Sequence, residues 1–149
     1  EKSRTGRLEA IKELIRTGRV RTEQWGGNEF LSLKENKLSR IPLDRVRILA
    51  PFDPIVRDRK RFQELWGWEY RFEAYIPAAK RNLGYYAMPV LWRDAIIGWA
   101  NAVVEDGKLH LDFKYADRRP SENAFFPAAE QEARKMAAFL GLAETACSI

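Results

Sequence analysis

Four short apolar or alternating stretches lie between residues 69 and 115, and they constrain the fold more than any other feature. Lys108–Tyr115 is the clearest, because apolar and polar side chains alternate along it, as a half-buried strand requires. The other three are aromatic-rich and comprise Glu69–Ile76, Gly84–Trp92 and Ala95–Val104. Consecutive strands joined by short connections predict an antiparallel meander, arranged as a sheet or a small barrel.

Helices are expected on both sides of this meander in the sequence. Residues 58–66 predict a short helix, which follows a short strand over residues 46–50. A longer C-terminal helix is expected over residues 127–141, because Pro127 suits the first helical position and Gly141 suits its end. Its expected buried stripe consists of Ala129, Ala133, Met136, Ala137 and Leu140. Residues 144–149 are expected to form a tail, and the fold class is α+β.

The first 33 residues predict one helix and one β-hairpin. Apolar residues at helical spacing are Leu8, Ile11, Leu14 and Ile15, with Thr5 as the expected N-cap and Gly18 near the end. Residues 20–25 and 30–33 predict the two strands, joined by a turn over residues 26–28. A helix followed directly by such a hairpin is typical of the second half of a winged helix, with the hairpin as the wing.

We therefore expect two domains. Residues 1–43 are expected to be the C-terminal part of a winged-helix domain, and residues 44–149 a β-barrel-like domain. Because the chain opens with Glu1 rather than Met, we expect it to be a processed product or a piece of a longer protein.

Composition excludes several classes of protein. At 46% apolar residues the chain can bury a core, and it contains no apolar run long enough for a membrane helix. One Cys and one His exclude a disulfide framework and leave little for a zinc site. Neither a metal nor an organic cofactor is expected.

Positive charge is concentrated in the first part of the chain. Residues 1–61 hold 16 Lys and Arg against 9 Asp and Glu, whereas residues 62–149 hold 10 against 12. This asymmetry favours an anionic partner, with double-stranded DNA as the first candidate and an Arg-rich solvated surface as the alternative.

Three short segments are the candidate DNA contacts. The densest basic run supplies Arg57, Arg59 and Arg61, and a later loop supplies Lys80 and Arg81 among tyrosines. Cations interleaved with aromatic residues suit contact with phosphate and bases, although a charged loop in front of core tyrosines is the alternative. The hairpin turn supplies Gly26, Gly27 and Asn28, small residues that allow close approach to a DNA backbone or simply form the turn.

No catalytic residue emerges from the sequence. Glu69 and Glu73 share one face of their expected strand, but Arg71 lies between them and favours ion pairing over acid–base chemistry. His110 is expected on the solvent face of its strand, and Cys147 has no basic neighbour that would activate its thiol.

A long ordered pattern in the middle of the chain carries a family resemblance. It consists of Pro51-Phe52-Asp53-Pro54, Arg57-Asp58-Arg59, Arg61, Leu65-Trp66-Gly67-Trp68, Tyr70-Arg71-Phe72-Glu73-Ala74-Tyr75-Ile76-Pro77, Lys80-Arg81, Gly84-Tyr85-Tyr86 and Met88-Pro89-Val90-Leu91. This pattern resembles the C-terminal half of winged-helix DNA glycosylases of the YcaQ/AlkZ type. The match covers roughly residues 46–98 and agrees with the helix and hairpin before it.

The resemblance implies tandem winged helices followed by a β-barrel, and hydrolysis of N-glycosidic bonds at alkylated or crosslinked bases. The family's catalytic Gln-x-Gln or Gln-x-Asp motif has no match at Gln24, Gln63 or Gln131. The family also tends to follow residues 97–98 with a basic and an acidic residue, where this chain has Trp99 and Ala100. The chain alone is therefore expected to be inactive.

The resulting hypothesis is a C-terminal fragment that docks a glycosylase-like protein on duplex DNA, in the cytoplasm and associated with the nucleoid. The alternative is a non-catalytic DNA-binding or regulatory protein of the same architecture. A third possibility makes the barrel an interaction module for protein partners.

Overall fold

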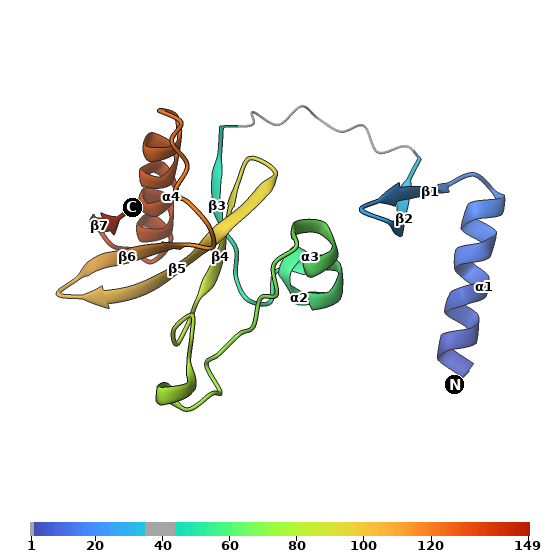
Figure 1. Cartoon of the computed structure of the whole chain (residues 1–149), viewed down its shortest axis with the longest axis horizontal. Coiled ribbons are helices and arrows are strands. Elements are labelled where there is room, and N and C mark those ends of the chain that lie inside the picture. The colour runs from blue at the N-terminus through green and yellow to red at the C-terminus, as the bar shows by residue number, and fades with distance from the viewer. Residues whose placement is uncertain (1, 35–43) are drawn as a thin grey trace. The chain divides into compact units, whose positions relative to one another are not determined.

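The computed structural model describes residues 2–34 and 44–149, and the chain forms two compact units, residues 1–41 and 42–149 (Figure 1). The domain boundary expected between residues 43 and 44 lies at the edge of a segment outside the described residues. No helix in the two described ranges is long and apolar enough to cross a membrane.

The first unit consists of one helix and one hairpin. Helix α1 spans Lys2–Arg16, strand β1 spans Val20–Trp25 and strand β2 spans Asn28–Leu33. Because α1 begins at Lys2, the expectation that Thr5 is its N-cap is wrong. The two strands pair antiparallel, and Asn28 pairs with Trp25 instead of belonging to the turn. The turn therefore has two residues, Gly26 and Gly27, with φ of 55° and 80°, as a type I′ turn requires.

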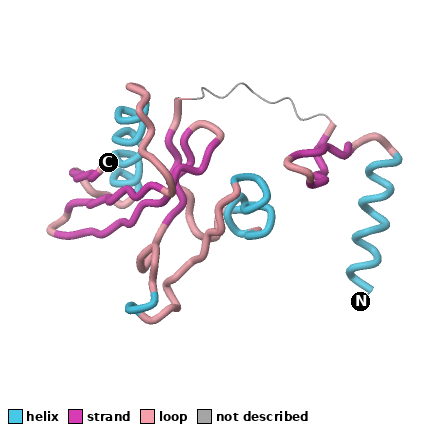
Figure 2. The backbone as a smooth tube through the Cα atoms, viewed as in Figure 1, coloured by secondary structure: helices cyan, strands magenta, loops and turns pink. Residues whose placement is uncertain are grey.

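The second unit is built on a five-stranded sheet with the strand order β3-β4-β5-β6-β7. Figure 2 shows the strands in magenta and the helices in cyan. Its strands are Val46–Ile48 (β3), Met88–Trp92 (β4), Ala95–Glu105 (β5), Lys108–Tyr115 (β6) and Glu144–Ser148 (β7). The pairs from β3 to β6 are antiparallel, whereas β6 and β7 are parallel. Over residues 44–149, β3 and β7 are the edges of an open sheet, so the structure has the sheet rather than the closed barrel.

Two sequence expectations about this sheet are wrong. Residues 69–76 lie in a long loop that runs from Gly67 to Ala87 and contains a short 3-10 helix, Ala78–Lys80 (η1). The segment pairs with no strand of the sheet, and its two buried residues, Tyr70 and Glu73, are three positions apart, so burial does not follow the period of two that a strand requires. The expected tail forms β7, since the helix before it returns the chain alongside β6 and makes parallel pairing possible.

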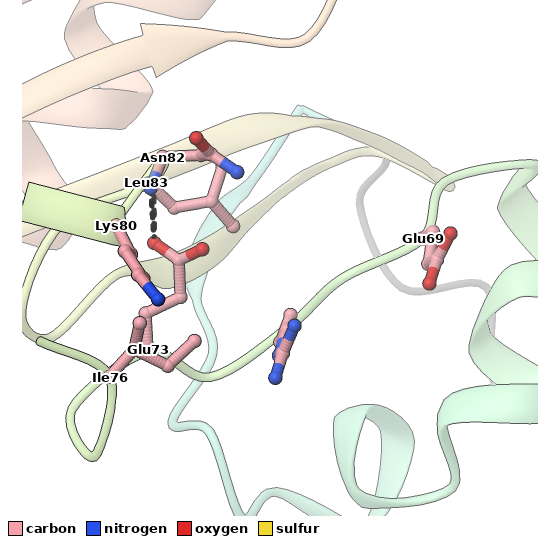
Figure 3. Close-up of a pocket in the computed structure, with 7 residues that line it drawn as sticks. Glu69, Glu73, Ile76, Lys80, Asn82 and Leu83 are labelled. Atoms are coloured by element: carbon pink, nitrogen blue, oxygen red, sulfur yellow. Dashed lines mark hydrogen bonds between the residues drawn. The ribbon is translucent and has the colours of Figure 1, made fainter.

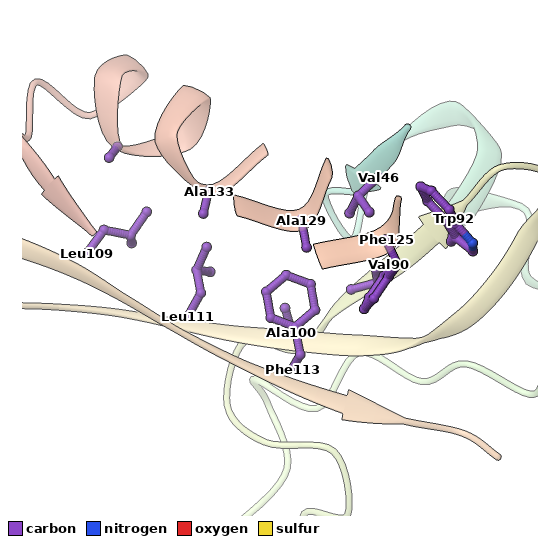
Figure 4. Packing of buried hydrophobic residues seen from close by; sticks show 11 residues of the cluster. Val46, Val90, Trp92, Ala100, Leu109, Leu111, Phe113, Phe125, Ala129 and Ala133 are labelled. Atoms are coloured by element: carbon purple, nitrogen blue, oxygen red, sulfur yellow. The ribbon is translucent and has the colours of Figure 1, made fainter. Parts of the chain in front are cut away.

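Helix α4, which spans Phe125–Phe139, packs on the sheet and closes the main core (Figure 4). Its Ala129, Ala133 and Ala137 are buried, and they pack with Leu109, Leu111, Phe113 and their neighbours. The helix begins two residues before Pro127, whose missing N–H is tolerated in a first turn. The expected burial of Leu140 is wrong, because it is 45% exposed just beyond the helix.

A second hydrophobic cluster lies under two short helices. Helix α2 spans Pro54–Arg57 and α3 spans Arg59–Trp66, so the expected helix 58–66 is present and α2 was missed. Asp53 and Asp58 cap the two helices by accepting hydrogen bonds from backbone N–H groups. The buried residues of this second cluster are Leu49, Val56, Phe62 and Tyr70.

Candidate nucleic-acid interface

Arg57 and Arg61 are exposed at neighbouring ends of α2 and α3. With Pro54 and Asp58 they line a shallow depression of about 280 Å³. Arg61 donates a hydrogen bond to the carbonyl oxygen of Pro54 at 2.5 Å, which leaves its other guanidinium nitrogens available. Arg57 has no ion-pair partner in the described part of the chain. Both side chains can therefore reach an anion in solvent.

Arg59 is used inside the protein. Its Nη1 donates to the carbonyl oxygen of Val56 at 2.8 Å and its Nη2 to that of Pro51 at 3.2 Å. The guanidinium also lies over the ring of Tyr70, 4.5 Å from its centroid. The sequence analysis grouped Arg59 with Arg57 and Arg61 as a candidate DNA contact. The geometry instead favours a structural role, in which Arg59 holds α2 and α3 on the second cluster.

Tyr70 is the buried centre of that arrangement. Its hydroxyl donates to the carbonyl oxygen of Ala87 at 2.6 Å, which ties the start of the long loop to its end. Burial raises the pKa of Tyr70 to about 12, while the charge of Arg59 opposes this shift. Because the folded-state pKa lies above the ordinary value of 10.0, this contribution to stability is complete below pH 10 and is lost as the pH rises through about 12.

Glu73 fixes the part of the loop that carries Lys80 and Arg81 (Figure 3). Its side chain is only 3% exposed, and its Oε2 accepts hydrogen bonds from the backbone N–H groups of Asn82 and Leu83, both at 2.7 Å. Lys80 is exposed beside a depression of about 430 Å³ that Glu73 also lines.

The interpretation of Glu69 and Glu73 as one surface pair is therefore wrong. Glu69 is exposed and Glu73 is buried, and in residues 44–149 neither forms the expected ion pair with Arg71. Glu73 acts as a clasp for the loop, a role that requires a carboxylate facing two backbone donors.

Arg81 and two residues of β5 complete the support of this loop. Arg81 Nε donates to the carbonyl oxygen of Ile76 at 2.8 Å, and its guanidinium lies 4.9 Å from the ring centroid of Tyr85. Trp99 Nε1 and Asn101 Nδ2 both donate to the carbonyl oxygen of Leu83, at 2.7 and 2.9 Å. The strand that departs from the family pattern thus has a polar role, which is to hold the loop.

Replacing Glu73 by alanine is expected to destabilise the second unit by about 1 to 3 kcal/mol, because two partly buried backbone N–H groups lose their acceptor. The amides of Asn82 and Leu83 should exchange hydrogen faster, as measured by hydrogen–deuterium exchange with NMR. Glu69→Ala is the matched control, since that carboxylate is exposed. Unchanged exchange at both amides in the Glu73 variant would contradict the clasp.

Comparison with known proteins adds to this geometry. The family model described as DNA glycosylase AlkZ-like matches residues 3–139. The chain belongs to the AlkZ-like DNA glycosylase family. This assignment confirms the resemblance that the middle of the sequence carries.

The AlkZ-like fold is also seen in a solved structure, the Streptomyces sahachiroi DNA glycosylase AlkZ. The two chains are 17% identical with a TM-score of 0.55, and the match covers 93% of this chain. It covers 35% of the other chain, so this AlkZ-like chain spans about a third of that protein's length. At this identity the likeness concerns the fold.

The expected wing contacts of this AlkZ-like chain lie in the first unit. Gly26 and Gly27 form the turn, and a Cβ added at Gly27 would meet no atom within 4 Å. Asn28 begins β2, and the adjacent Trp25 is 62% exposed at the tip. The turn is therefore open to a partner. The strand pattern of residues 20–25 correctly predicts β1, but it does not indicate that the ring of Trp25, the last residue of β1, is exposed beside the turn.

His110 and Cys147 are the other reactive side chains of the AlkZ-like chain. His110 is exposed on β6, as expected, and burial raises the pKa of the Cys147 thiol. Within residues 2–34 and 44–149 no group of three His, Cys, Asp or Glu side chains is placed to hold a metal ion.

Proposed function

We propose that this chain docks an AlkZ-like glycosylase on duplex DNA, as the C-terminal part of a protein that removes alkylated or crosslinked bases. The cations Arg57, Arg61 and Lys80 contact phosphates. Arg81 holds the loop that carries Lys80. Gly26 to Asn28 approach the DNA backbone. The water-activating Gln-x-Gln or Gln-x-Asp motif lies outside this chain. Membership of the family supports this proposal.

The observation that carries the proposal is how charge is divided around the long loop and the two short helices. Three of the five acidic side chains there accept hydrogen bonds from backbone N–H groups: Asp53 from Ile55, Asp58 from Arg61, and Glu73 from Asn82 and Leu83. Glu64 pairs with Lys60, and Glu69 is exposed. In the same described region, Arg57 and Lys80 are exposed and have no ion-pair partner. Residues 50–87 hold seven Lys and Arg against five Asp and Glu, so exposed cations in this region stand in an excess of positive charge that attracts a polyanion such as DNA.

Changing Arg57, Arg61 and Lys80 together to alanine tests the proposed contacts. Duplex affinity should fall for all sequences, and the slope of log K against log salt should flatten by about 0.9 for each lost phosphate contact. Fluorescence anisotropy over a salt series measures both quantities. We leave Arg59 and Arg81 intact because their donors hold the fold.

The matched control removes three cations that are already paired with acids. Lys108, Arg134 and Lys135 form ion pairs with Glu144, Glu130 and Glu132. Changing these three to alanine lowers the net charge by the same amount as the first variant. It should leave most of the duplex affinity and most of the slope of log K against log salt. Two results would contradict the proposed contact surface. One is an unchanged affinity after the change of Arg57, Arg61 and Lys80, and the other is an equal loss of affinity in the control variant.

A non-catalytic DNA-binding role is the second candidate, and one sequence observation favours it for the isolated chain. None of Gln24, Gln63 and Gln131 is followed two positions later by Gln or Asp. We expect the chain to bind a duplex that carries an alkylated purine without releasing the base, as followed by chromatography. Base release by the purified chain would contradict this assignment.

A further inference from the structure

Four aromatic side chains form an exposed patch on the second unit. We define the aromatic patch as Phe52, Phe72, Tyr75 and Tyr86. Phe72 is central, since its ring centroid lies 5.6 Å from that of Phe52, 6.0 Å from that of Tyr75 and 5.2 Å from that of Tyr86, all edge to face. The outer rings are open to solvent, with 63% of Phe52, 87% of Tyr75 and 41% of Tyr86 exposed. Contiguous exposed rings of this kind mark binding surfaces more often than single exposed residues do.

The backbone holds Tyr75 in place without burying its ring. Tyr75 lies in a turn in which the N–H of Ile76 donates to the carbonyl oxygen of Glu73 at 3.0 Å. The clasp by Glu73 fixes one side of this turn, and the hydrogen bond from Arg81 to Ile76 fixes the other. The backbone that carries the ring is therefore already ordered, so little backbone freedom is lost when a ligand stacks on it.

Two cations lie near the aromatic patch, because Arg71 and Lys80 line one depression together with Ile76, the residue after Tyr75. Arg71 directly precedes Phe72 and is exposed, and Arg81 reaches the residue that follows Tyr75 while its guanidinium covers Tyr85. Exposed rings interleaved with cations are how proteins bind unpaired nucleotides, because bases stack on the rings while phosphates contact the cations. Bases inside an intact duplex do not present a free face for such stacking.

We propose that the aromatic patch binds unpaired nucleotides of DNA, with a base stacked on Tyr75 and the adjoining phosphates near Arg71 and Lys80. This inference rests on the proposed DNA-docking function and deepens it. The DNA that the chain binds is then a duplex with a few unpaired nucleotides beside it, not a duplex alone.

The test compares two labelled DNAs with the full 149-residue chain by fluorescence anisotropy: a duplex, and the same duplex with a short bulge of thymidines. The bulged DNA should bind at least about 5-fold more tightly, since stacking one base corresponds to a factor of about 5 to 150. Tyr75→Ala should abolish this preference while leaving duplex affinity unchanged. Tyr75→Phe, which keeps the ring, should retain it.

Phe139→Ala is the matched control, because Phe139 is 89% exposed on α4 and lies outside the aromatic patch. A wild-type chain that binds both DNAs equally would overturn the inference and leave the docking function standing, as would a preference that survives in Tyr75→Ala. Failure of the chain to bind either DNA would overturn the docking function as well. A circular dichroism melt of each variant establishes that it is folded.

Discussion

Phe62→Ala should destabilise the second unit by about 3 to 5 kcal/mol, the range found when a buried Phe is truncated. Phe62 is fully buried, and its ring lies within 6.0 Å, centroid to centroid, of Trp66, Trp68 and Tyr70. Removing it leaves a cavity that these large rings cannot fill without moving. Because this ring anchors α3 to Tyr70 and the rest of the second cluster, the segment that carries Arg57 and Arg61 should loosen along with the fold.

Urea denaturation followed by near-ultraviolet circular dichroism measures this effect. Phe139→Ala provides the comparison, since truncating a nearly fully exposed ring should change the free energy of unfolding by no more than about 0.5 kcal/mol. A cost below about 1 kcal/mol for Phe62→Ala would mean that the second cluster does not depend on this ring.

Gly98→Ala is expected to have an effect of similar size, about 2 to 6 kcal/mol, through steric strain rather than a cavity. Gly98 has φ of 154°, and a Cβ there would lie 2.0 Å from the carbonyl oxygen of Lys114 on the paired strand β6. The register of β4 against β5 shifts next to this position, which marks a β-bulge. Only glycine lets β5 and β6 approach so closely at that point.

Gly107→Ala separates this clash from the general cost of placing alanine at a positive φ. Gly107 has φ of 72°, and a Cβ there would meet no atom within 4 Å, so its replacement should cost only about 1 to 2 kcal/mol. Thermal melts of both variants provide the comparison. Equal losses of stability would contradict the close approach of the two strands at Gly98.

The sequence predicted the elements whose patterns are local. Strand β6 alternates cleanly, and Asp106 with Gly107 forms its tight turn with β5. The C-terminal helix and its alanine stripe follow from helical spacing together with Pro127 and Gly141 as end signals. In each case the hydrophobic period and the turn residues agree with the burial that the fold requires.

The errors arose where long-range contacts decide the structure. The alternation of residues 69–76 has the period of a strand, but Tyr70 bonds to Ala87 and Glu73 to Leu83, so the segment is held as a loop by side chains. The formation of β7 depends on α4 returning the chain beside β6, which no local pattern reveals.

In the candidate site, too, the sequence predicted local features and missed those that depend on long-range contacts. The sequence identified Arg57, Arg61 and Lys80 by charge, and all three are exposed. It did not distinguish Arg59, because charge alone does not reveal that its donors face the carbonyl groups of Pro51 and Val56. The aromatic patch was missed because Phe52 and Tyr75 are 23 positions apart and meet only through Phe72.

Binding of the unmodified chain to an undamaged duplex over a salt series tests the central claim most directly. If Arg57, Arg61 and Lys80 contact phosphates, log K should fall with log salt with a slope of about −2.7 or steeper, at about −0.9 per contact. A flat response, with no binding even at low salt, would contradict a docking role and leave the basic segment as a solvated surface.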